Sequence, residues 1–121
     1  MPMKINQGLT GSGIAAAAIG ANLLVTRSTV AGKVDLCGAS GLAVGSTQEA
    51  TASGDLCTYF RPIGTAWVTC SAAIAIGDMV KPAAAGKVAP EATVTTITAA
   101  TIGQALTATS TDGDTFLMEW R

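Results

Sequence analysis

The chain has 121 residues, a net charge of −1 and only 12% charged side chains, about half the charged fraction of an average globular protein. Its few basic residues are scattered, so the sequence does not predict nucleic acid as a partner. Histidine, the usual general base and metal ligand, is absent. We therefore expect a single non-enzymatic domain that holds no metal and no cofactor.

The first thirteen residues include three glycines and predict a flexible arm over residues 1–13. An extended arm of this kind can add a strand to the edge of a neighbouring sheet, where main-chain hydrogen bonds provide the affinity. We assign this partner-binding role to the middle of the arm, namely Met3, Lys4, Ile5, Asn6 and Gln7.

An apolar stretch follows from Ile14 to Val25. Its alanines favour a short helix within residues 14–24, limited to one or two turns because Gly20 interrupts it. The stretch is too short to cross a bilayer, and too little positive charge precedes it for a signal peptide. We therefore expect no membrane partner and no targeting segment.

Two features could indicate chemistry but favour a structural interpretation. The odd number of cysteines, without a C-x-x-C pair, predicts buried free thiols in a reducing cytoplasm at Cys37, Cys57 and Cys70. Asp112 and Asp114 flank a glycine, which is typical of a turn, and two carboxylates are too few for a calcium site.

The two halves of the chain resemble one another, and this internal similarity predicts a duplication. Four short phrases recur in the same order: Ala18-Ile19-Gly20 as Ala75-Ile76-Gly77, Ala31-Gly32-Lys33-Val34 as Ala85-Gly86-Lys87-Val88, Val44-Gly45 as Ile102-Gly103, and Ser53-Gly54-Asp55-Leu56 as Asp112-Gly113-Asp114-Thr115. We infer one β domain over residues 14–121 that contains pseudo-repeats of about residues 18–61 and 73–121.

Short apolar runs separated by turn residues predict many strands. Residues 56–60 and 65–70 read as two strands around a turn that joins the halves, and residues 92–98 read as another strand. At the C-terminus, Phe116, Met118 and Trp120 alternate with smaller or polar residues, which indicates a strand with one bulky face. The predicted fold is all-β, a small β-sandwich or β-barrel with at most one short helix.

Three further residues are candidates for contact with a partner. Trp67 and Trp120 are two of the few large side chains, so each belongs either to the core or to an interface. Arg121 ends the last strand, where it could pair with a carboxylate of a partner. With the arm residues, they form the predicted partner-binding set.

Several of these phrases resemble the capsid cement (decoration) proteins of tailed phages, which are grouped as a domain of unknown function. The phrases lie at residues 73–80, 85–88 and 101–106, and a closing strand at 115–120 completes the pattern. The Thr-rich stretch from Glu91 to Ala100 departs from it. The resemblance implies a β-rich homotrimer that binds the major capsid protein on the outer surface of the head, without catalytic residues.

The predicted function is therefore a virion protein, made in the host cytoplasm, that reinforces the contacts between major capsid subunits. Another phage structural part, such as a head-fibre base or a tail-tube component, is the alternative. A small enzyme or a ligand-binding barrel is a third hypothesis, for which the chain offers few catalytic groups.

Overall fold

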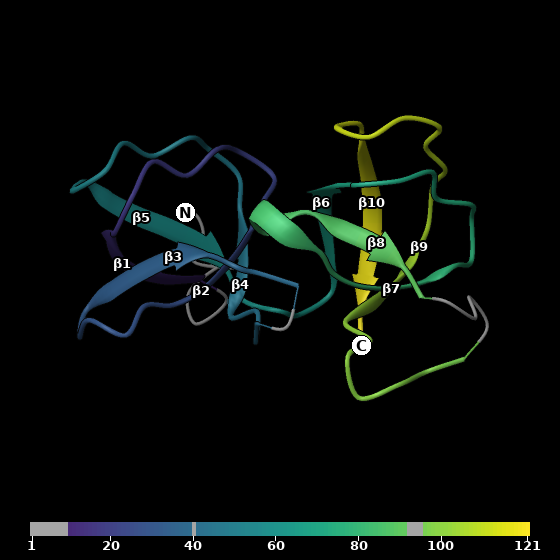
Figure 1. Ribbon diagram of the computed structural model, residues 1–121, viewed down its shortest axis with the longest axis horizontal. Coiled ribbons are helices and arrows are strands. Elements are labelled where there is room, and N and C mark those ends of the chain that lie inside the picture. Colours follow the sequence, from purple (N-terminus) through teal and green to yellow (C-terminus); the bar gives the residue numbers. More distant parts are fainter. Residues whose placement is uncertain (1–9, 40, 92–95) are drawn as a thin grey trace, which may run out of the picture.

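The computed structural model describes residues 10–39, 41–91 and 96–121, and in these it contains ten strands and one 3-10 turn. The first five strands form a closed barrel in the order β1-β3-β2-β4-β5 (Figure 1). They are β1 (Thr10–Ala15), β2 (Leu24–Arg27), β3 (Lys33–Leu36), β4 (Gly45–Thr47) and β5 (Leu56–Phe60).

The remaining strands form a second five-stranded sheet in the order β6-β10-β9-β7-β8. They are β6 (Thr65–Thr69), β7 (Met79–Pro82), β8 (Val88–Pro90), β9 (Gly103–Ala105) and β10 (Thr115–Trp120), with the 3-10 turn η1 (Ala84–Gly86) between β7 and β8. The prediction of an all-β fold with a barrel is confirmed. We call the two sheets, with their connections, the first and the second unit.

The two units have the same topology. β1 pairs antiparallel with β5, as β6 does with β10, and β2 pairs with β3 and β4, as β7 does with β8 and β9. The parallel pairing of β1 with β3 corresponds to a single bridge between Cys70 and Val88 in the second unit. Even the turns match, because Ala15 N donates to Asp55 O and Cys70 N donates to Asp114 O, both at 2.9 Å.

Three of the four recurring phrases occupy equivalent places in the two units. The fourth is displaced, because Ile19 bridges Thr51 as Ile74, and not Ile76, bridges Thr109. The correct match for Ile19 is therefore two residues earlier than the sequence comparison placed it.

A glycine in each unit allows two strands to approach closely. A Cβ atom at Gly45 in β4 would overlap the carbonyl oxygen of Phe60 in β5. The equivalent Gly103 in β9 would place its Cβ 2.5 Å from the carbonyl oxygen of Glu119 in β10. No other residue type fits these positions without moving the neighbouring strand.

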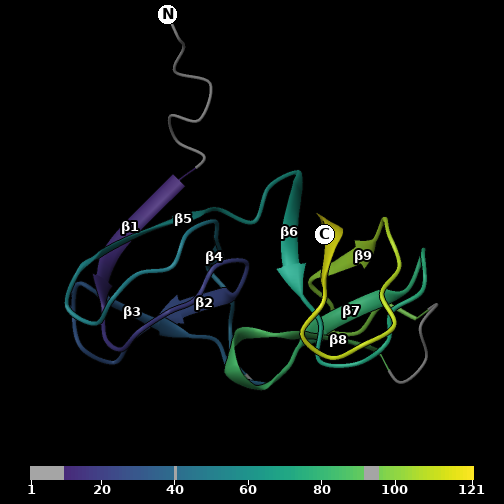
Figure 2. The ribbon, with the colours of Figure 1, turned by 90° about the horizontal axis from the view of Figure 1, so that it is seen from above.

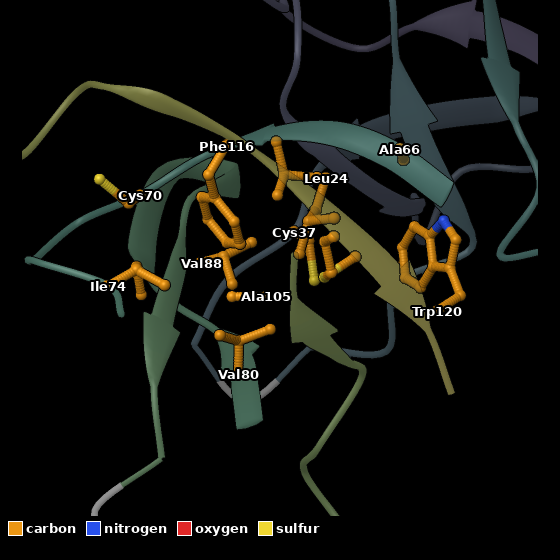
Figure 3. Packing of buried hydrophobic residues seen from close by; sticks show 12 residues of the cluster. Leu24, Cys37, Ala66, Cys70, Ile74, Val80, Val88, Ala105, Phe116 and Trp120 are labelled. Atoms are coloured by element: carbon orange, nitrogen blue, oxygen red, sulfur yellow. The ribbon is translucent and has the colours of Figure 1, made fainter. Parts of the chain in front are cut away.

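The units are joined through a common core (Figure 2). Phe116 and Met118 of β10 are fully buried, and Leu24 and Cys37 of the first unit pack into the same cluster (Figure 3). Hydrogen bonds also cross between the units, from Gly86 N of η1 to Cys37 O at 2.8 Å and from Thr69 Oγ1 to Asn22 O at 2.9 Å. A second, smaller cluster lies within the first unit.

All three cysteines are buried free thiols, as predicted, and burial raises the pKa of the Cys37 thiol. The predicted helix within residues 14–24 is wrong. Ile14 and Ala15 belong to β1, and Ile19 is buried where it bridges Thr51, so long-range pairing overrides the local preference of alanine.

The predicted arm over residues 1–13 ends earlier than expected, because residues 10–13 belong to β1 and pair with β5. The remainder of the arm, residues 1–9, lies outside the described residues. Of the strand predicted at residues 92–98, the described residues 96–98 have no strand pairing.

A buried carboxylate holds the loop after β8. Glu91 Oε2 accepts hydrogen bonds from Thr101 Oγ1 at 2.6 Å and from Thr98 Oγ1 at 2.8 Å. The bond from Thr101, aided by Thr98 and the charge of Lys81, outweighs the effect of burial and lowers the pKa of Glu91.

We predict that Gly45→Ala lowers the free energy of unfolding by about 3 kcal/mol, because the new methyl group overlaps main-chain atoms that cannot move aside. Gly38→Ala is the control, since a Cβ there meets nothing within 4 Å. Urea denaturation of both variants measures the difference. Equal stability of the two variants would contradict the close approach of β4 and β5.

We predict that Glu91→Gln costs about 1 kcal/mol at neutral pH, because two hydrogen bonds to a charged acceptor become bonds to a neutral one. Since the folded-state pKa of Glu91 is lowered, its contribution is present above the unfolded-state pKa and is lost as the pH falls through the folded-state pKa. The stability gap to wild type should therefore close in acid. Urea denaturation across this pH range tests it, with the exposed Glu49→Gln as control.

Candidate docking surfaces

The residues of the predicted partner-binding set do not form one surface. Met3 to Gln7 lie outside the described residues. Trp67 is 47% exposed on the outer face of β6, whereas Trp120 is only 9% exposed and belongs to the core. Arg121 follows β10, where its guanidinium donates to Gln104 Oε1 and lies 3.9 Å from Glu119 Oε1.

An apolar row crosses the outer face of the second unit. Antiparallel pairing places Trp67 of β6 opposite Leu117 of β10, and opposite residues share one face of a sheet. Leu106, which is 39% exposed, follows β9 and donates its N–H to Leu117 O at 2.8 Å. We call Trp67, Leu117 and Leu106 the apolar row.

The outer face of the first unit differs at the same positions. There, Ser12 of β1 lies opposite Thr58 of β5, in the place that Trp67 and Leu117 occupy in the second unit. The fold therefore does not require large apolar side chains at these positions. Comparing the repeats position by position could have identified the row from the sequence; the search for aromatic residues found only Trp67.

A hollow of about 400 Å³ lies over the outer face of β5. Leu56, Thr58 and Phe60 line it from the strand, and Asp55 and the segment 48–52 complete its wall. We call it the β5 hollow. The second unit has an equivalent hollow of about 490 Å³ beside β10, which Ala108, Thr109, Ser110, Asp114 and Thr115 line.

The two hollows differ in polarity. Leu56, 63% exposed, stands at the position that Thr115 occupies in the second unit. Among the residues that line them, only the β5 hollow has large apolar side chains.

A shallow groove of about 650 Å³ runs between the units. Most of its lining is apolar and small, and it comprises Ala39, Gly41, Leu42, Ala43, Pro62, Pro82, Ala99, Ala100, Thr101, Ile102, Trp120 and Arg121. The indole Nε1 of Trp120 is buried and has no hydrogen-bond partner among the described residues. Trp120 therefore reaches a partner only through this groove.

The described residues contain no group of three or more His, Cys, Asp or Glu side chains placed to hold a metal. Asp112 forms an ion pair with Lys87 at 2.9 Å, beside Gly113 in a turn with a φ of 95°. That pairing joins β8 to the loop before β10 and gives Asp112 a structural role. In the same part of the chain, no helix has the length and apolar character needed to span a membrane.

Comparison with known proteins gives a match in structure alone. No family model matches the chain, and no curated protein matches it. Among solved structures, the head fiber gp8.5 N base of bacteriophage phi29 is similar, with a TM-score of 0.77 and 16% sequence identity over 93% of this chain and 92% of that one. At this identity the likeness shows the fold, and the chain has the fold of a phage head-fibre base.

Proposed function

We propose that this protein is a structural protein of a tailed phage, mounted on the outer surface of the head as the base of a fibre and bound to the major capsid protein. The fold similarity to a head-fibre base carries the proposal, because it covers nearly all of both chains. Fold alone does not determine function, so the character of the surface has to agree.

The surface supports a binding role. Large apolar side chains that the fold does not require are exposed on the outer faces, and an apolar groove lies between the units. Exposed apolar surface of this kind is typical of protein–protein contact. With only 12% charged residues, docking would depend on apolar contact and main-chain hydrogen bonds more than on ion pairs.

The fibre base is favoured over a cement protein that reinforces the shell. The phrases that resemble cement proteins coincide with requirements of the fold: Ala85 and Gly86 have positive φ, and Gly103 allows the close approach of β9 to β10. They therefore inform about the fold more than about the function. A reinforcing role, with a homotrimer on the shell, is the second candidate.

We predict that the purified protein co-sediments in a saturable manner with mature heads that lack it. Binding should be weak or absent with unexpanded procapsids, whose outer surface has not yet acquired its final arrangement. Electron microscopy of the decorated heads should place the protein on the outer surface. Absence of binding to heads, together with assembly of the protein into tubes, would favour a tail component instead.

The two head functions differ in their effect on the shell. A fibre base should leave the temperature at which heads release their DNA unchanged when the protein is added back. A cement protein should raise that temperature. Release of DNA, followed by the fluorescence of a DNA-binding dye, separates them.

A further inference from the structure

We propose that copies of this protein associate head to tail, with the apolar row of one copy seated on the β5 hollow of the next and the Trp67 indole inserted into it. The contact lies between copies of the chain, so it goes beyond the proposed function and does not depend on it.

The apolar row is costly on a solvent-exposed sheet and has no role in holding the unit together. Its central pair, Trp67 and Leu117, is replaced by Ser12 and Thr58 in the first unit, which folds with the same topology. Trp67 leaves about half of its surface in solvent. Tryptophan is enriched among the residues that contribute most to binding.

The β5 hollow fits an indole ring in size and in chemistry. Its volume of about 400 Å³ lies at the lower end of pockets that hold small ligands. Leu56 and Phe60 offer an apolar surface for the ring, and the carboxylates of Glu49 and Asp55 can accept a hydrogen bond from the indole N–H. Neither carboxylate has an ion pair within the described part of the chain.

The location of the two surfaces predicts the symmetry of the assembly. The row is on the second unit and the hollow is on the first, so one copy can use both at once, each with a different neighbour. Such a heterologous contact closes into a ring when the rotation between copies permits. A two-fold contact of row against row would leave the exposed Leu56 in solvent.

Cysteine cross-linking tests the contact on the full-length protein. Trp67→Cys and Leu56→Cys variants are purified separately, mixed, oxidised and separated on a non-reducing gel. The native cysteines are buried and do not compete. We expect disulfide-linked dimers in the mixture and none from either variant alone.

The control replaces Ser12, the exposed counterpart of Trp67 in the first unit, by cysteine. Ser12→Cys mixed with Leu56→Cys should give no link. Dimers from Trp67→Cys alone would overturn the head-to-tail contact in favour of row against row. Equal linking by Ser12→Cys and Trp67→Cys would overturn it as random collision.

Sedimentation velocity provides an independent test that needs no cross-link. Wild type should sediment as an oligomer, and Trp67→Ser should weaken the association about 10- to 30-fold, as expected for loss of a central aromatic residue. A monomeric wild type would overturn the proposal. If that monomer still bound phage heads, the proposed function would stand.

Discussion

Each unit depends on the close approach of two strands at a glycine: β4 to β5 at Gly45, and β9 to β10 at Gly103. Tight pairing there aligns the alternation of β5 and β10, so that Cys57 and Tyr59, or Phe116 and Met118, face inward. Neither unit then stands alone, because side chains of the first complete the core of the second. The chain therefore behaves as one domain built from two similar sheets.

Part of this architecture could be predicted from the sequence. The alternation from Phe116 to Trp120 predicted a strand and, with it, the burial of Trp120. Local alanine content misled at residues 16–23, since the position of Ile19 depends on a bridge to the distant Thr51. Closure of the first sheet alone depends on the length of the β1–β3 pairing, which no local pattern reveals.

The candidate surfaces were harder to predict than the core. Leu56, Leu106 and Leu117 are unremarkable singly in a chain that is 49% hydrophobic. They become informative only when the repeats are aligned in space, because the equivalent positions are polar in the other unit. Inward positions are constrained by packing, whereas outward positions are free to diverge and acquire binding. A symmetric fold thus presents two different faces.

The claim that the inward residues maintain the fold while the outward row makes contact with other copies can be tested in one variant. Trp67→Ser, Leu117→Thr and Leu106→Gln together give the second unit the outer residues of the first. We predict that this variant, with thermal unfolding unchanged when compared as a monomer, has the sedimentation coefficient of a monomer at a concentration where wild type is oligomeric. A coefficient equal to that of wild type would contradict the account.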